Sequence, residues 1–267
     1  MEEIEIEDIE KNIKNTQVLV FAGGRAKRMG SPDTPKALLE LNGKPLIDYC
    51  IEQYKKCGFT EFVLLLGFLH DKIEKHVGDG SKYGVKVRYS IEPETGVGRD
   101  MAFKLALDSK KIDRSKRSLV CFPDDIILDS KFPIRLLMQH TYGIEMFGSK
   151  ATVVFVTGTE YPYGVAKIDK DGNVISFEEK PFIPEVTSTG VYMVEPDVYN
   201  IIDEKIDARS NIFMDHVMER DILPGLAAKG RVYSLIMPPG CWVSINTQKD
   251  YENAEKILSR ANNKQNH

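Results

Sequence analysis

The sequence has no hydrophobic run long enough to cross a membrane. A spanning helix needs about 20 consecutive apolar residues, and no stretch of the 267 residues approaches that length. The N-terminal stretch MEEIEIEDIEK is acidic, whereas a secretory leader carries positive charge before its apolar part. We therefore expect a cytoplasmic protein that works without a membrane.

A strong net charge is also missing. The chain has 36 Lys and Arg against 40 Asp and Glu, which gives a net charge of −4. A protein that binds nucleic acid usually carries a broad positive surface, so we expect no nucleic-acid partner. With 42% hydrophobic and 28% charged residues, the composition is ordinary for a soluble globular protein.

Cysteine and histidine are scarce, with four and five residues, and neither has the spacing of a metal site. The cysteines form no C-x-x-C pair. We interpret them as buried thiols in a reducing compartment, which argues against a disulfide scaffold and against zinc. The four cysteines are Cys50, Cys57, Cys121 and Cys241.

Two common nucleotide-binding motifs are absent, namely the P-loop G-x-x-x-x-G-K-[ST] and the dinucleotide fingerprint G-x-G-x-x-G. In their place, an apolar run at 18–22 ends in Gly23-Gly24 and is followed by three cations. Glycines let backbone N–H groups approach phosphate oxygens, and cations neutralise them. The stretch 18–45 therefore predicts a polyphosphate site, although a basic turn after any α/β strand is an alternative that these residues leave open. The cations are Arg25, Lys27 and Arg28.

Expected strands and helices alternate through the first half of the chain. The strands are expected at 17–22, 62–66, 85–91, 119–122 and 152–156. The helices are expected at 46–56, 70–77, 98–108 and 132–145. Such alternation predicts an α/β protein with three α/β/α layers and a mostly parallel sheet. Ligands of such sheets bind outside the carboxyl ends of the strands, so Gly23, Gly96 and Asp124 should meet at one edge.

The pattern changes after about residue 157. A D-G turn inside 170–172 predicts a hairpin over 163–179. Further strands are expected at 187–194, 232–236 and 242–245, with helices at 213–220 and 248–262. No linker separates the halves, so we expect one domain at 16–267: a nucleotide-binding half at about 16–157, a smaller β-rich lobe at about 158–247, and a closing helix.

Residues 1–15 form an acidic appendage before this domain. Its isoleucines fit a helix face by their spacing of three and four, and two of them fit a strand equally well. Packing on the domain, packing on a neighbouring subunit and partial disorder are all left open.

The stretch AGGRAKRMG…PKALLELNGKPLI resembles the signature of the sugar-1-phosphate nucleotidyltransferases, or nucleotide-sugar pyrophosphorylases. That signature reads roughly G-G-x-G-T-R-[ML]…P-K-x-[ML]…G-[KR]-P, and Ala26 stands where a third glycine is usual. YGVAKID…DGNVISFEEKP is similar to the F-x-E-K-P region of the same family. The resemblance covers about residues 17–257. It implies the Rossmann-like nucleotidyltransferase fold, with a mixed central sheet and a sugar-binding lobe.

The resemblance also implies the reaction. An NTP would give its nucleotidyl group to a sugar 1-phosphate, and a nucleotide sugar and pyrophosphate would be released. The cofactor would be Mg²⁺ or another divalent ion such as Mn²⁺. The implied partners are the NTP and the sugar 1-phosphate, and a homo-oligomer is left open. We expect no acyltransferase β-helix domain after the closing helix.

Site residues follow from the same resemblance. The implied catalytic cations are Arg28 for pyrophosphate, Lys36 for the reacting phosphates and Lys180 for the sugar phosphate. The implied nucleotide-binding residues are Ala22, Gly23, Gly24, Arg25, Glu92, Gly96 and Gly98. The implied sugar-phosphate-binding residues are Gly164, Glu179, Lys180 and Thr189.

The metal ligand implied by the resemblance is Asp124, with Asp125 as the alternative. Mg²⁺ takes oxygen ligands and keeps several waters. The family has W-x-D-x-G-T-P near its end, whereas this chain has WVSINT, so Ser244 stands in the place of an aspartate. A serine hydroxyl is an uncharged and weaker ligand. Asp124 with water could suffice, another carboxylate such as Asp125 or Asp100 could substitute, or the protein could bind nucleotide without turnover.

Glu92 lies where uridylyl and thymidylyl members often carry glutamine. An ionised carboxylate only accepts hydrogen bonds, which suits an amino-bearing base such as cytosine or guanine. Two alternatives stay open. One is a cytidylyl- or guanylyltransferase for another phosphorylated acceptor, and the other is a non-catalytic regulatory subunit that binds a nucleotide sugar.

Overall fold

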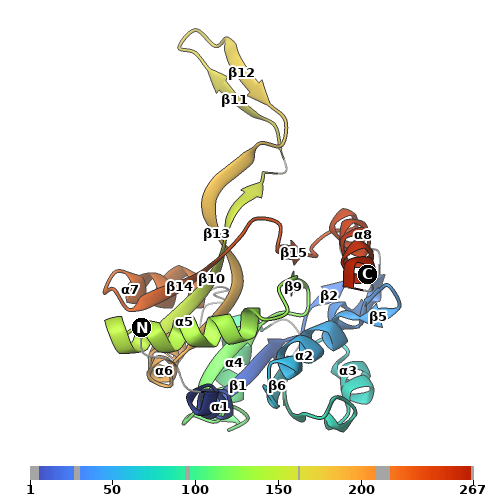
Figure 1. The fold of residues 1–267 in the computed structure, drawn as a ribbon, viewed down its shortest axis with the longest axis vertical. Helices are drawn as coiled ribbons and strands as arrows, with labels where there is room; N and C mark the ends of the chain where they lie inside the picture. Colours follow the sequence, from blue (N-terminus) through green and yellow to red (C-terminus); the bar gives the residue numbers. More distant parts are fainter. Residues whose placement is uncertain (1–5, 27–30, 94–96, 162, 208–216, 266–267) are drawn as a thin grey trace.

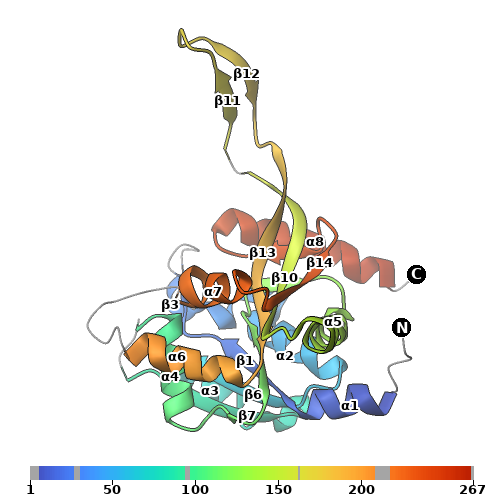
Figure 2. The same ribbon diagram turned by 90° about the vertical axis from the view of Figure 1, so that its left-hand side faces the viewer.

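A seven-stranded sheet forms the centre of the computed structural model, which describes residues 6–26, 31–93, 97–161, 163–207 and 217–265. The strand order is β14-β10-β13-β8-β1-β6-β7 (Figures 1 and 2). The strands are β1 (Thr16–Phe21), β6 (Glu61–Leu66), β7 (Lys86–Ile91), β8 (Arg117–Cys121), β10 (Ala151–Glu160), β13 (Phe182–Val194) and β14 (Val232–Met237). Only β13 runs antiparallel to its neighbours in this sheet, so the predicted mixed, mostly parallel sheet is confirmed.

Helices cover both faces of the sheet because the side chains of its strands alternate. Val18 and Val20 of β1 belong to one buried cluster and Leu19 to the other. The first cluster packs under α2 (Leu46–Lys56), α3 (His70–Val77) and α5 (Phe132–Phe147). The second packs under α4 (Arg99–Asp108), α6 (Asp197–Asp207) and α7 (Leu223–Ala227). Strands buried on both faces give the continuous apolar runs seen in the sequence, and the predicted three layers are present.

Short strands and the last helix close one end of the body. The paired strands are β2 (Arg25–Ala26) with β3 (Ser31–Pro35), β4 (Glu40–Leu41) with β5 (Lys44–Pro45), and β9 (Asp125–Ile127) with β15 (Trp242–Ser244). Single 3₁₀ turns, η2 (Lys36–Leu38) and η3 (Ser81–Tyr83), follow β3 and α3. Helix α8 (Gln248–Gln265) packs its buried Ala254 and Leu258 against this end. The C-terminal segment thereby reaches the residues that follow β8.

Strands β10 and β13 continue beyond the sheet into a long arm. It ends in the hairpin of β11 (Val165–Ile168) and β12 (Val174–Glu178), which confirms the hairpin predicted from the D-G turn. Figures 1 and 2 both show the arm projecting from the body. Every residue of β11 and β12 is exposed. Strand β13 is longer than the predicted strand at 187–194 because it pairs with β10 as far as Phe182.

The N-terminal appendage forms helix α1 (Ile6–Lys14), which packs on the body. Ile13 lies against Gly58, and the Asn12 side-chain oxygen accepts a hydrogen bond of 3.0 Å from Arg117. Of the alternatives left open by the sequence, a helix on the domain is therefore the one observed. The helix predicted at 213–220 lies partly outside the described residues. Its end forms one π-helical turn, Met218–Ile222, before α7. Within the described ranges, none of the helices has the length and apolarity to span a membrane.

Candidate active site

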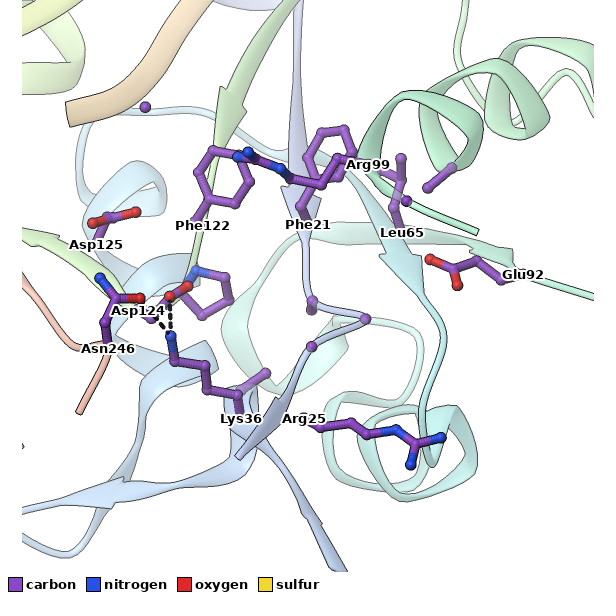
Figure 3. Close-up of a pocket in the computed structure, with 18 residues that line it drawn as sticks. Phe21, Arg25, Lys36, Leu65, Glu92, Arg99, Phe122, Asp124, Asp125 and Asn246 are labelled. Carbon is purple, nitrogen blue, oxygen red and sulfur yellow. Dashed lines mark hydrogen bonds and ion pairs between the residues drawn. The ribbon is translucent and has the colours of Figure 1, made fainter. Parts of the chain in front are cut away.

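A cavity of about 610 Å³ opens at the carboxyl ends of β1, β6 and β8. Figure 3 shows side chains from these separate segments directed toward it. Its walls include the following residues implied by the sequence: Ala22, Gly23, Gly24, Arg25, Lys36, Glu92, Gly98, Asp124 and Asp125. These residues span more than 100 positions of the chain and meet because parallel strands end at the same edge.

The turn Ala22–Gly24 connects β1 to the cavity wall. The Ala22 N–H donates to the Leu65 carbonyl at 2.9 Å, and the Lys36 N–H donates to the Gly24 carbonyl at 3.1 Å. The guanidinium of Arg25 lies 4.1 Å from the centre of the Phe68 ring. The turn is thus fixed to β6 on one side and to the segment of Lys36 on the other.

Glu92 lies over two glycines at the edge of the cavity. A Cβ atom on Gly67 would lie 2.8 Å from the Glu92 Oε2 atom, and one on Gly23 would lie 3.1 Å from Oε1. Only glycine fits at Gly67 without a shift of the Glu92 carboxylate. Gly98 lines the same wall with a φ of 87°, where a glycine is favoured. Gly96 and Arg28, both implied by the family signature, lie outside the described residues.

Lys36 and Asp124 meet on the floor of the cavity. The Lys36 ammonium donates to the Asp124 carboxylate and, at 3.2 Å, to the Asn246 side-chain oxygen (Figure 3). The side chains of Lys36 and Asp124 are 18% and 21% exposed, so both remain accessible from the cavity. Asp124 is held in place because the Ile245 N–H donates to its backbone carbonyl at 2.9 Å.

Asp125 forms the neighbouring wall and is more deeply enclosed. The Trp242 indole N–H donates to its carboxylate at 2.9 Å. Burial, and then the charge of Asp124, raise the pKa of Asp125 to about 7, although hydrogen bonds from Ser244 and Trp242 act in the opposite direction. Ser244 is directly opposite Asp125 in the β9–β15 pair. Its hydroxyl accepts a hydrogen bond of 2.8 Å from the Asn246 amide.

Asp124 and Asp125 are two neighbouring carboxylates of the cavity wall that could hold a divalent cation. One or two carboxylates, completed by waters and phosphate oxygens, are the usual donors for Mg²⁺, so this set fits the ion. No group of three or more His, Cys, Asp and Glu side chains suited to a metal gathers in the described part of the chain, at this site or elsewhere.

Asp100 does not supply the missing carboxylate, which corrects one of the alternatives left open by the sequence. The residue is only 5% exposed, and its side chain accepts backbone N–H bonds from Val217 at 2.7 Å and Met218 at 3.1 Å. Both carboxylate oxygens are therefore used to hold the segment before α7.

Gly164, Glu179 and Lys180 lie on the arm, outside the walls of the cavity. A Cβ atom on Gly164 would lie 2.9 Å from the Glu179 Oε2 atom, so these two residues face each other. Lys180 has a φ of 50° and forms the bend between β12 and β13. The structure brings these residues close to one another and keeps them apart from Lys36 and Asp124.

Thr189 is buried in β13, and its neighbour Gly190 is the residue that lines the cavity. The Thr189 hydroxyl donates to the Val154 carbonyl at 3.0 Å. Gly190 has a φ of 83°, and a Cβ atom there would lie 3.5 Å from the Phe122 ring. At this position of β13, Gly190 and not Thr189 therefore faces the cavity.

The cavity walls also include residues to which the sequence assigned no role, among them Phe21, Arg99, Phe122 and Asn246. The rings of Phe21 and Phe122 lie 5.5 Å apart, and the Arg99 guanidinium lies 5.2 Å from the centre of the Phe122 ring. Aromatic residues at strand ends carry no motif, so no signal was available for them. Asn246 did have a signal, because it stands where the family signature has glycine.

The chain is similar to several known proteins. The family model described as "Nucleotidyl transferase" matches residues 17–260. The chain is 28% identical over 243 residues to a mannose-1-phosphate guanylyltransferase catalytic subunit beta from Drosophila pseudoobscura pseudoobscura, covering 88% of this chain and 60% of that protein. It is 25% identical to a UTP–glucose-1-phosphate uridylyltransferase from Synechocystis sp. (strain ATCC 27184 / PCC 6803 / Kazusa), covering 91% of this chain and 64% of that protein. The chain thus spans less than two thirds of the length of these relatives.

A solved structure shares the fold. A crystal structure described as a glucose-1-phosphate thymidylyltransferase from Bacillus anthracis, in complex with a sucrose, superposes with a TM-score of 0.68. The match covers 91% of this chain and 94% of that chain at 24% identity.

Proposed function

The chain belongs to the nucleotidyl transferase family, and we propose that it transfers a nucleotidyl group from an NTP to a sugar 1-phosphate. One observation carries this proposal: Lys36 and Asp124 meet on the floor of a cavity whose wall is the glycine turn after β1. A volume of about 610 Å³ is within the range of small-molecule sites.

In the proposed reaction, a phosphate oxygen of the sugar 1-phosphate forms a bond to the α-phosphorus of the NTP. The bond from that phosphorus to its bridging oxygen breaks, and pyrophosphate leaves with the electron pair. Such reactions depend mainly on positioning and on neutralising the charge of the phosphates. Lys36 supplies positive charge, and the N–H groups of Gly23 and Gly24 approach the phosphate oxygens. A Mg²⁺ ion held by Asp124 and Asp125 would add charge neutralisation when bound.

We propose guanine as the base and a hexose 1-phosphate as the acceptor. Guanine presents a ring N–H and an amino group on one edge, whereas uracil and thymine present a single ring N–H there. The Glu92 carboxylate, a pure acceptor when ionised, has two oxygens for the two guanine donors. The relatives named as mannose-1-phosphate guanylyltransferases support the same choice.

The test is pyrophosphate release with GTP, CTP, UTP, dTTP and ATP, each with mannose 1-phosphate and glucose 1-phosphate in the presence of Mg²⁺. We expect the fastest release with GTP and mannose 1-phosphate. Glu92→Gln should narrow the preference for GTP over UTP, because an amide presents only one acceptor oxygen beside a donor group. Release that is fastest with UTP would contradict the choice of base, and no release with any pair would contradict the reaction.

A second candidate is a non-catalytic subunit that binds a nucleotide sugar. Ser244 in place of an expected aspartate, and Lys180 on the arm, favour it. This candidate predicts calorimetric binding of GDP-mannose to the wild-type chain together with no pyrophosphate release from any of the pairs above.

A further inference from the structure

We propose that Asn246 is a positioning residue that holds the Lys36 ammonium when a divalent cation occupies Asp124. The inference rests on the proposed function, because it assigns a role inside the same site. It starts from the two acceptors of Lys36, the charged Asp124 carboxylate and the neutral Asn246 amide oxygen at 3.2 Å. Figure 3 shows Lys36 directed toward both.

A metal ion and Lys36 compete for the same carboxylate. Both are positive, and the Lys36 ammonium already contacts Asp124. A divalent cation at Asp124 would therefore require the ammonium to give up that contact. Asn246 offers an acceptor that the cation does not need, so Lys36 can stay at the cavity floor, facing the phosphates.

Asn246 is anchored through both its side chain and its backbone. Its amide N–H group donates to the Ser244 hydroxyl at 2.8 Å, which orients its oxygen toward Lys36. Its backbone N–H donates to the Asp250 carboxylate at 3.1 Å, at the start of α8. The preceding N–H, of Ile245, is bonded to the Asp124 carbonyl. The amide oxygen is thus held at a fixed place relative to Asp124.

The Asn246 amide oxygen is an uncharged acceptor, so it leaves the positive charge of Lys36 in place. A carboxylate in place of the amide would form a second ion pair with Lys36 and reduce the positive charge available to phosphate oxygens. An amide holds the ammonium by a hydrogen bond and leaves its charge in place. Ser244 and Asn246, which both depart from the family signature, would therefore act as one unit.

Binding of Mn²⁺ to the nucleotide-free protein, followed by electron paramagnetic resonance, tests the proposal without an activity assay. In Asn246→Ala the displaced ammonium loses the second acceptor that the described residues give it, so we expect the Mn²⁺ dissociation constant to rise at least about fivefold. Gln248→Ala, an exposed neighbour on α8, is the matched control and should bind as the wild type does. In a Lys36→Met background, Asn246→Ala should have no further effect, because the competing ammonium is gone.

Ser244→Ala provides a second variant in case Asn246→Ala does not fold. It leaves Asn246 in place but removes the hydroxyl that orients it. We expect the Mn²⁺ dissociation constant to rise about twofold. Three results would overturn the proposal. The first is equal Mn²⁺ affinity in the wild type and Asn246→Ala, and the second is an effect of Asn246→Ala that persists in the Lys36→Met background. The third is no Mn²⁺ binding by the wild type. Failure of the proposed function would appear separately, as absence of pyrophosphate release by a wild-type protein that binds Mn²⁺.

Discussion

The Lys36 ammonium and the Asp124 carboxylate form an ion pair across 88 positions of the chain. Both side chains are partly exposed to the cavity, and such pairs contribute on the order of 0–1 kcal/mol to the free energy of unfolding. The pair is therefore a poor source of stability. Under the proposed function, its charges are those that phosphates and a divalent cation would require at this point of the cavity floor.

Lys36→Ala should greatly slow pyrophosphate release and leave the fold intact. Loss of one preorganised charge at a reacting phosphate costs on the order of 100-fold to 1,000-fold in rate, while the thermal melting temperature should change little. Lys75→Ala, a substitution of an exposed lysine on α3, is the matched control. Wild-type rates in Lys36→Ala would remove this lysine from the mechanism.

Gly24→Ala should weaken nucleotide binding without loss of stability. A Cβ atom at Gly24 meets no protein atom within 4 Å, and its φ is not in the left-handed region, so the methyl group only takes space in the cavity. We expect the NTP dissociation constant to rise about tenfold, or about 1.4 kcal/mol, by calorimetry. Gly225→Ala on α7, where a Cβ atom is equally unobstructed, should bind normally. Equal affinity in the two variants would show that phosphate does not approach the Gly24 backbone.

His140 should make the protein less stable in mild acid. The ring is fully buried between the Thr152 hydroxyl at 2.9 Å and the Glu195 carboxylate at 3.1 Å. Burial lowers the pKa of His140, and this outweighs the opposite effect of Glu195. The folded state resists protonation of His140. The contribution of the neutral ring to the free energy of unfolding is therefore complete above the ordinary pKa near 6.5 and is lost as the pH falls below it.

Thermal unfolding of the wild type and His140→Gln, at about pH 7.5 and about pH 5.5, measures this effect. The melting temperature of the wild type should fall more than that of the variant over this interval. Parallel losses in the two proteins would assign the acid sensitivity to other groups.

Asp125→Asn should raise the stability of the metal-free protein at alkaline pH. The pKa of Asp125 is raised to about 7 by burial and by Asp124, so the folded state binds a proton that the unfolded chain releases near pH 4. The wild type therefore loses stability as the pH rises from about 4 to about 7. The asparagine keeps an acceptor for Trp242 and carries no charge.

Calorimetric unfolding in a chelator checks this prediction. The melting temperature of the variant should be higher than that of the wild type at about pH 8 and close to that of the wild type at about pH 4. Asp171→Asn, at the exposed tip of the arm, is the control. If the difference in melting temperature between Asp125→Asn and the wild type does not grow with pH, the raised pKa of Asp125 is contradicted.

Much of the fold could be predicted because its signals are local. Apolar runs such as 62–66 give buried strands, and the apolar spacing in 46–56 gives the helix that covers them. The meeting of Gly23 and Asp124 at one cavity was also predictable, since it follows from the shared direction of parallel strands.

The rest depends on contacts that no local pattern encodes. Asp100 and Asp124 carry the same side chain, so the sequence does not distinguish them. Asp100 accepts backbone hydrogen bonds only because the tertiary fold brings residues 217–218 against it. The extent of the arm depends on how far β10 and β13 remain paired. Asn246 becomes a partner of Lys36 only because the segment before α8 lies beside Asp124, which follows β8.

The arm also provides a point at which the peptide chain could be cut while its two parts stay together. Its tip, at the turn 170–172, is exposed and lies beyond the last strands of the body. The segments before and after it are interleaved in the sheet, since β13 lies between β8 and β10, and β14 pairs with β10. A break of the peptide chain at this turn would therefore leave two polypeptides that the sheet still holds together as one body, with the cavity built from both.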